Sequence, residues 1–396
     1  MAASDLSSTL SPDVLALAQD TVELRRDIHR HPELGFEETR TAGIVAAGLK
    51  AAGLEVRTGV AKTGVVGLLR GAQPGKTLLV RADMDALSLT EEVDRPWKST
   101  VPGSMHACGH DGHVAIALSA ARVLAARRER LKGQVKFVFQ PAEEGPGGAE
   151  PMIAEGVMRD PQVDAAIGLH IWNGLEAGTL GIGSGPMMAA SDEFRILVEG
   201  VGGHGAYPHT AVDPVLAAAH IVVALQTIVA RNVSPLEPAV VTVGIVRAGT
   251  RFNIIPRTAE LVGTLRAYST ETREFLIRRV SEIARGVAEA QGAKIQLHIE
   301  RGYPPTVNDQ GMSAFCTEVA AGVFGRERVV LPERSMGGED MSYFLKLVPG
   351  CFMFLGSMNK AKGLDAPHHS PLFDFDEDVL PLGVETFVRV AEAYLL

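Results

Sequence analysis

The sequence is poor in cysteine and in positive charge, and it has few aromatic residues. Its 396 residues include three cysteines, Cys108, Cys316 and Cys351, an odd number spread far apart. Such a set is no disulfide framework and fits a reducing compartment, so we expect a cytoplasmic protein. The net charge of −9 argues against nucleic acid and against anionic membrane surfaces as partners.

Long hydrophobic runs are also lacking. The most apolar stretch, residues 217–230, contains His220, Gln226 and Thr227, and we expect it to be too short and too polar to span a bilayer. Residues 1–6 show no basic segment followed by an apolar run, so no signal peptide is predicted. With 46% hydrophobic and 21% charged residues, the composition is ordinary for a soluble globular protein.

Short apolar strands alternate with helices along most of the chain. Strands are expected at residues 65–69, 78–82, 135–139, 165–169 and 352–355, and helices at 12–29, 39–52, 114–126, 312–324, 340–347 and 379–394. This alternation is typical of an α/β fold whose mostly parallel sheet is covered on both faces.

A different pattern interrupts this fold. Its order is β-α-β-β-α-β, with strands expected at 194–198, 240–246, 261–266 and 295–299 and helices at 214–230 and 271–290. Such an order is that of a small ferredoxin-like domain with an antiparallel sheet. We therefore expect one domain made of residues 1–188 and 304–396, and an inserted domain of residues 189–303.

Residues 105–113 gather three histidines, one cysteine and two glycines. Cysteine and histidine are soft and borderline metal ligands, and the glycines let the backbone fold tightly. The same stretch could instead be a polar loop that opens a helix, with Asp111 as its cap. If it binds metal, Cys108 is a candidate ligand, whereas His113 starts a predicted helix and is expected to pack or to make a hydrogen bond instead.

More residues of the metal-binding type follow the predicted strands. These are Asp83 and Asp85 after one strand, Glu143 and Glu144 after another, His170 after a third, and His369 in the loop after a fourth. Because ligands bind at the carboxyl ends of strands in open α/β sheets, these loops should converge with residues 105–113. The placement therefore predicts a metal site.

Two ions are favoured over one. A Cys108 thiolate can bridge two divalent ions about 3.5–4 Å apart, and such a pair activates a water between them. A rival interpretation makes Cys108 a nucleophile paired with His110, although a base normally reaches a nucleophile from outside its own loop. Because Glu143 and Glu144 are adjacent, they point in different directions, so one can be a ligand and the other the general base. Zinc suits cysteine and histidine, and manganese, cobalt or nickel could occupy a mixed site.

Nine stretches carry a family resemblance, in order along nearly the whole chain: residues 81–87, 105–113, 139–145, 186–194, 203–204, 253–256, 263–266, 338–340 and 369–371. With them the sequence resembles the M20 family of metallo-amidohydrolases. It is closely similar to the aminoacylase and hippurate hydrolase branch, which includes the indoleacetyl-amino acid hydrolases.

The resemblance implies roles for single residues. Two ions would be held by five ligands, Cys108, His110, Glu144, His170 and His369, and Glu143 would be the catalytic base. His368 competes with His369 as a ligand, and the family motif alone selects His369. The inserted domain would be a lid that often dimerises; on it His204 would stabilise the oxyanion, and Asn253 and Arg266 would hold the substrate carboxylate. Asp85 would orient a ligand from behind.

We therefore expect a metal-dependent amidohydrolase of the hippurate hydrolase or aminoacylase type, acting on N-acyl amino acids as a homodimer or dimer-based oligomer. The alternative is a dipeptidase or carboxypeptidase on the same dinuclear site. A third interpretation, a binding protein on an inactive hydrolase scaffold, predicts missing ligands, whereas all five are present in the sequence.

Overall fold

A computed structural model describes residues 8–396, so the prediction made on residues 1–6 lies outside the described residues. The chain forms two compact units. Unit 1 extends to Gly185 and resumes over Val307–Glu333 and Asp340–Leu396, and unit 2 comprises Pro186–Thr306 and Arg334–Glu339. The chain thus changes unit a few residues from the expected positions, and no sequence pattern indicated that Arg334–Glu339 would belong to unit 2.

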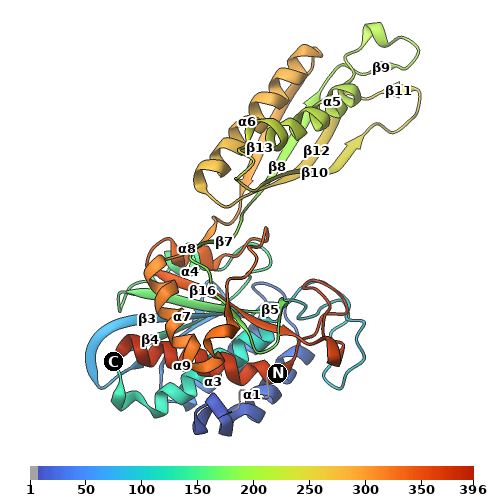
Figure 1. Ribbon diagram of the computed structural model, residues 1–396. Helices are drawn as coiled ribbons and strands as arrows, with labels where there is room; N and C mark the ends of the chain where they lie inside the picture. The colour runs from blue at the N-terminus through green and yellow to red at the C-terminus, as the bar shows by residue number, and fades with distance from the viewer. Residues whose placement is uncertain (1–7) are drawn as a thin grey trace. The chain divides into compact units, whose positions relative to one another are not determined.

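Unit 1 is built on an eight-stranded sheet (Figure 1). In spatial order the strands are β1 (Glu55–Val60), β2 (Gly64–Arg70), β4 (Lys132–Gln140), β3 (Gln73–Asp83), β5 (Ala165–Glu176), β16 (Gly350–Met358), β6 (Leu180–Gly181) and β15 (Val329–Val330). The pairings β4–β3, β3–β5, β5–β16 and β6–β15 are parallel, and the others are antiparallel. The mostly parallel α/β sheet predicted from the sequence is confirmed.

The order in which the chain visits the strands indicates where a ligand could bind. From β3 the chain passes to β4 on one side, and it then crosses to β5 on the other side of β3. Successive crossovers therefore turn in opposite directions, and a crevice forms at such a point outside the carboxyl ends of the strands.

Helices cover both faces of this sheet (Figure 1). On one face lie α1 (Pro12–Arg30), α2 (Thr39–Ala51), α3 (His110–Ala126), α7 (Gln310–Phe324) and α9 (Leu380–Leu395), and on the other α4 (Ala149–Ala154) and α8 (Met341–Leu345). Helix α3 is almost wholly buried between the sheet and its neighbours, because alanines such as Ala117 and Ala121 let it approach closely.

Unit 2 has the element order that the sequence predicts. Its elements are β8 (Ala190–Glu199), α5 (Pro214–Thr227), β10 (Ala239–Ala248), β12 (Thr258–Ala267), α6 (Thr270–Ala290) and β13 (Lys294–Arg301). The four strands form an antiparallel sheet in the order β10-β12-β8-β13. Both helices pack on it around a separate core that includes Phe194, Ile221 and Leu276.

Helix α5 continues as a π-helical turn over Ile228–Asn232, so the apolar helix is longer than expected. By length and composition alone Pro214–Asn232 could cross a membrane, with a mean hydropathy of 1.6. However, Ile221 and Leu225 lie in the core of unit 2, whereas Val223 on the other side is exposed. The helix is therefore apolar on two sides, one covered by its own sheet and one open.

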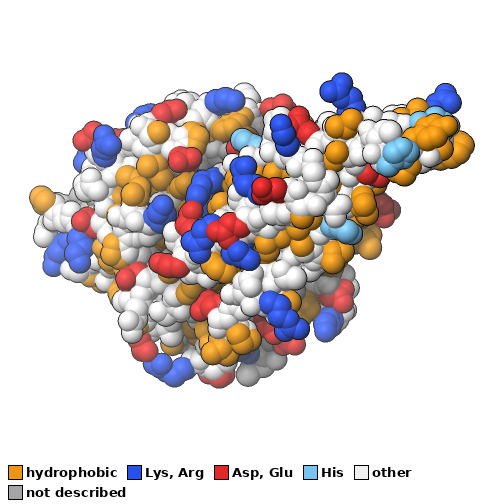
Figure 2. All heavy atoms as spheres, turned by 90° about the horizontal axis from the view of Figure 1, so that it is seen from above, with side chains coloured by type: hydrophobic (Ala, Val, Ile, Leu, Met, Phe, Trp, Pro, Cys, Tyr) orange, Lys and Arg blue, Asp and Glu red, His pale blue; other side chains and the backbone are white. Residues whose placement is uncertain are grey.

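Short strands complete the chain. In unit 2, β9 (Gly203–His204) pairs with β11 (Ile254–Ile255), beyond one end of the four-stranded sheet (Figure 1). Figure 2 shows hydrophobic side chains beside histidines at this end of unit 2, where Tyr207 and Phe252 are exposed. The chain passes between the units through β7 (Gly185–Met188) and β14 (Thr306–Asn308).

Candidate metal centre

Cys108 and His110 lie at the amino end of α3. The helix begins at His110, earlier than expected, because Gly109 precedes it with a left-handed φ of 92°. A Cβ on Gly109 would lie 3.3 Å from Cβ of Ile171, so glycine lets this turn lie against β5. Gly109 also occupies the N-cap position that Asp111 would have filled in a polar loop, and Asp111 lies in the first turn.

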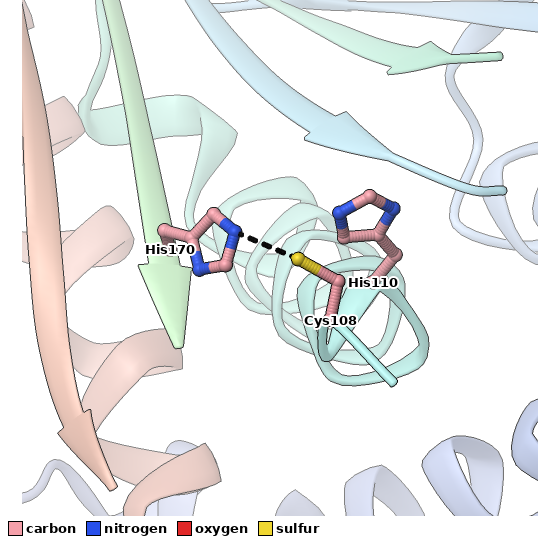
Figure 3. Close-up of side chains that lie close together, drawn as sticks. All are labelled: Cys108, His110 and His170. Carbon is pink, nitrogen blue, oxygen red and sulfur yellow. Dashed lines mark hydrogen bonds between the residues drawn. The ribbon is translucent and has the colours of Figure 1, made fainter. Parts of the chain in front are cut away.

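His170 completes a first group of donors with these two residues. It lies inside β5 rather than after it, since the strand continues to Glu176. Its Nδ1 donates to the carbonyl of Ile171 at 2.6 Å, and its Nε2 lies 3.4 Å from Sγ of Cys108 (Figure 3). The ligand atoms of Cys108, His110 and His170 all lie within 4.8 Å of one another.

Cys108 also belongs to a second group, with Glu144 and His369. Nε2 of His369 lies 3.1 Å from Oε1 of Glu144. His369 adopts a left-handed φ of 62°, and its N–H donates to the carbonyl of Ala107 at 2.8 Å. The loop that carries His369 is thereby tied to the Cys108 loop, and the thiol lies where the two groups meet.

The structure separates His368 from His369. Nε2 of His368 donates to the carbonyl of Ile171 at 2.9 Å, and its ring packs 4.9 Å from the rings of Trp172 and Phe373. Burial lowers the pKa of His368 to about 4. His368 is thus used in packing, and His369 is the histidine of this pair that faces Glu144 and Cys108.

Asp85 orients two of the candidate ligands. Nδ1 of His110 donates to the carbonyl of Asp85 at 2.9 Å, and the Asp85 side chain accepts the Glu144 N–H at 2.9 Å. With Nδ1 engaged, Nε2 of His110 is the nitrogen open to a ligand, and it makes no hydrogen bond within residues 8–396. A donor fixed through its other nitrogen is the usual arrangement of a metal-bound histidine.

Glu143 is buried beside these groups. Its carboxylate lies within 4.8 Å of ligand atoms of His110 and Glu144. The preceding residue, Ala142, has a positive φ of 55°, and its N–H is held by Oε1 of Glu38 at 2.8 Å. The carboxylates of the adjacent residues Glu143 and Glu144 thus both lie near the ring of His110.

His113 is engaged at both ring nitrogens. Nδ1 donates to Asp83 at 2.5 Å, and Nε2 accepts the Ile171 N–H at 2.8 Å. Asp83 is in turn paired with Arg81 at 2.6 Å. His113 therefore shapes the loop rather than offering a free donor, and Asp83 holds it in place.

The charges of the site fit cations. Burial, with the carboxylates Glu144 and Glu143, raises the pKa of the Cys108 thiol well above its ordinary value. Burial opposes protonation of His110, but Asp83 and Asp85 outweigh it and raise the pKa to about 10. Divalent ions would reverse both effects, favouring the thiolate and the neutral imidazole. The sulfur, nitrogen and oxygen donors and the open Nε2 of His110 fit divalent transition ions.

In unit 2, His204 and Asn253 lie together, and Arg266 lies elsewhere. His204 lies on β9, and Gly205 donates to the carbonyl of Asn253 at 2.8 Å, so His204 and Asn253 are neighbours. Nδ1 of His204 accepts the Ala206 N–H at 3.0 Å, which leaves the proton of a neutral ring on Nε2.

Arg266 is half-buried near the opposite end of β12, paired with Ser191 of β8. The end of the sheet nearest β9 is the Thr258–Glu199 pair. Eight residues separate the two pairs, about 26 Å at the rise of a strand. The expectation that Asn253 and Arg266 grip one carboxylate is therefore not met within a single unit 2, because β12 holds them apart.

The family model named Peptidase family M20/M25/M40 matches residues 79–393. The chain belongs to this family. Over 379 residues the M20 chain is 41% identical to IAA-amino acid hydrolase ILR1-like 4 of Arabidopsis thaliana, across 95% of this chain and 86% of that protein. It is 40% identical over 383 residues to thermostable carboxypeptidase 1 of Saccharolobus solfataricus, across 96% of each.

A solved structure gives the same result. The M20 chain matches a Bacillus subtilis protein described as a dinuclear metal binding peptidase from the M20 family, with a TM-score of 0.84 and 34% identity over 96% of this chain and 98% of that chain. The resemblance and the prediction of an amidohydrolase are confirmed. The comparison and the donor groups together support binding of divalent metal ions.

The sequence did not reveal the main-chain part of the site. The Ile171 peptide groups bond three histidines, and the Ala107 carbonyl anchors a fourth. Contacts made by peptide groups cannot be predicted from a pattern of side chains, because nearly all residues have the same main-chain groups. The nearest sequence signal is the pair Gly109 and Gly112, since glycine is required where backbone and strand approach this closely.

Proposed function

We propose that this M20 enzyme hydrolyses the amide bond of N-acyl amino acids with two divalent ions as cofactors. The observation that carries the proposal is the position of Cys108, whose thiol belongs to both donor groups. Zinc or manganese fits these mixed donors best, with cobalt or nickel possible. The similarity to an IAA-amino acid hydrolase supports the substrate class.

Cys108, His110, Glu144, His170 and His369 would hold the ions. When bound, the ions polarise the amide carbonyl and acidify the attacking water. Glu143 takes the proton from that water and passes it to the leaving nitrogen as the C–N bond breaks, which yields a carboxylic acid and a free amino acid. Asp85 keeps His110 and Glu144 oriented through the contacts described above.

Arg266 suits the substrate carboxylate, because a guanidinium can bind it with two parallel hydrogen bonds. His204, with its proton on Nε2, can donate to the oxyanion of the tetrahedral intermediate. At about 26 Å along β12, one copy of unit 2 cannot present both to one small substrate. We therefore propose a homodimer in which the second copy supplies His204 and Asn253.

Unit 2 offers a surface for such a dimer. Helix α5 exposes Val215, Leu216 and Val223, and Val246 is exposed on β10. β10 is an edge strand of the four-stranded sheet, and an open edge can pair with another copy. The free, buried cysteines also agree with the cytoplasmic location proposed from the sequence.

Glu143→Gln tests the chemistry. Because the substitution removes the base and no proposed ligand, metal content should stay at two ions per chain, and turnover of N-benzoylglycine should fall about 10²- to 10⁴-fold. Glu150→Gln, an exposed position on α4, is the matched control and should keep full activity. Near-normal turnover by Glu143→Gln would contradict the role.

Co-expression of Glu143→Gln with His204→Ala tests the dimer. Each variant alone should be inactive, but mixed dimers contain one site with Glu143 from one copy and His204 from the other, so activity should return. No recovery in mixed dimers isolated with two affinity tags would show that His204 acts within its own chain or not at all.

The second candidate function is cleavage of peptides at the same site, favoured by the similarity to a carboxypeptidase. Comparing kcat/KM for N-acetyl and N-benzoyl amino acids with that for dipeptides separates the two. Higher values for the dipeptides would replace our proposal by the peptidase.

A further inference from the structure

Arg25 of α1 is a fully buried cation that the proposed chemistry does not use. Its Nε lies 2.7 Å from Oδ2 of Asp111, Nη2 lies 3.0 Å from Oδ1 of Asp374, and Nη1 lies 3.2 Å from Oε1 of Glu377. The guanidinium carbon also lies 4.3 Å from the centre of the Phe375 ring. One guanidinium thus joins three carboxylates that come from two distant parts of the sequence.

These carboxylates lie next to the proposed ligands in the sequence. Asp111 directly follows His110 at the start of α3. Asp374 lies five residues after His369, and the Asn173 amide donates to the carbonyls of Ala366 and Asp374, so both ends of the loop that carries His369 are braced. Arg25 therefore spans the segment that supplies Cys108 and His110 and the segment that supplies His369.

Each segment keeps another basic partner of its own. Asp111 also lies 2.7 Å from Nδ1 of His29, Asp374 lies 2.7 Å from Nε of Arg95, and Glu377 lies 3.0 Å from Nε of Arg26. Without Arg25 each carboxylate still has a basic neighbour. What would be lost is the connection between the two segments.

We propose that Arg25 is a positioning residue that sets the distance between His369 and the Cys108–His110 turn, and so the affinity of the ion that His369 binds. The inference rests on the proposed two-ion function. A guanidinium is a rigid fork that reaches several carboxylates at once, whereas a lysine ammonium is a single point charge. Lysine at this position would preserve the charge but would not contact Asp111 and Asp374 at the same time in this way.

The chain offers a matched control in Arg127. It too joins distant carboxylates, contacting Asp13 and lying 3.1 Å from Glu392. It is the C-cap of α3, which has 17 residues, so it lies about 25 Å from the ligands. Arg127→Lys should therefore disturb packing without moving the site.

The test is metal binding by the full-length chain. Metal-free wild type, Arg25→Lys, Asp374→Asn and Arg127→Lys are titrated with Co²⁺ and Zn²⁺ in competition with a chromophoric chelator. The thiolate-to-cobalt absorption reports the Cys108 bond, and circular dichroism checks that each variant is folded. Asp374→Asn keeps the Arg25–Asp111 pair, so it tests the span even if Arg25→Lys fails to fold.

In Arg25→Lys and Asp374→Asn one of the two ions should bind about 10- to 100-fold less tightly than in the wild type, as when an outer partner of a ligand is lost. The other ion should bind as tightly as in the wild type, and activity should return to the wild-type plateau at saturating metal. Unchanged affinity in both variants, or an equal loss in Arg127→Lys, would overturn the inference and leave the proposed function intact. A wild-type chain that bound no ion would overturn both.

Discussion

Replacing Gly112 with alanine should damage the metal centre, although alanine is the better helix former. Gly112 lies in the first turn of α3, next to β5. A Cβ placed there would lie 2.3 Å from Cδ1 of Ile171 and 2.9 Å from Cζ of Phe375. Carbon atoms in contact prefer about 3.5–4.0 Å, so Ile171 or the helix must give way by roughly 1 Å or more.

Two opposing effects set the size of the change. In a helix interior, alanine is favoured over glycine by about 1 kcal/mol. Overpacking a tight core costs about 1–3 kcal/mol, so Gly112→Ala should lower the free energy of unfolding by up to about 2 kcal/mol. Gly43 in α2 is the control, because a Cβ added there would meet no atom within 4 Å among residues 8–396, its own helix apart.

Urea unfolding of wild type, Gly112→Ala and Gly43→Ala measures the difference. Gly43→Ala should be as stable as wild type or more so, and the two variants should differ by about 1–3 kcal/mol. Because the Ile171 peptide groups hold His170 and His368, Gly112→Ala should also bind metal at least about tenfold more weakly. Equal stability and equal metal affinity in the two variants would refute the reasoning.

Three other perturbations have expected outcomes. Asp85→Asn should weaken metal binding about 10- to 100-fold, measured by chelator competition, because the Asp85 carboxylate accepts the Glu144 N–H and also lies 3.3 Å from Nδ1 of His110. Dialysis against a strong chelator should lower the unfolding temperature of the wild type and abolish turnover, and added divalent metal should restore both. Lys136→Met should lower the free energy of unfolding by about 1.5–3 kcal/mol with kcat/KM unchanged. The substitution removes the ammonium that donates to three carbonyls, those of Val157, Arg159 and Pro161, and leaves them without this donor.

The sequence predicted the site best where candidate ligands and the candidate base come after a predicted strand. Glu143 and Glu144 lie just beyond the end of β4, and parallel strands bring such positions to one edge, so their meeting with the Cys108–His110 turn could be predicted. His170 was located correctly at that edge but wrongly outside the strand, because the apolar run stops before β5 does.

Other features depend on three-dimensional detail that no residue pattern contains. Spacing could not choose between His368 and His369, since the choice rests on a left-handed φ and on a hydrogen bond to Ala107. Likewise, family motifs name Asn253 and Arg266 together, but the length of β12 keeps them apart within one subunit. A motif identifies residues and does not give the distance between them in the fold.

The Ile171 peptide groups have a consequence for how this site can evolve. They receive His170 and His368 at the carbonyl and offer the N–H to His113, so the anchors are supplied by the main chain. A point mutation at position 171 leaves those groups in place, provided that its side chain still fits beside Gly112. An insertion or deletion of one residue in β5 would shift the pairing of Ile171 with Leu355 and exchange all three anchors at once. We therefore expect lineages of this enzyme to vary at this strand position only among side chains that fit beside Gly109 and Gly112, while accepting no change in the length of β5.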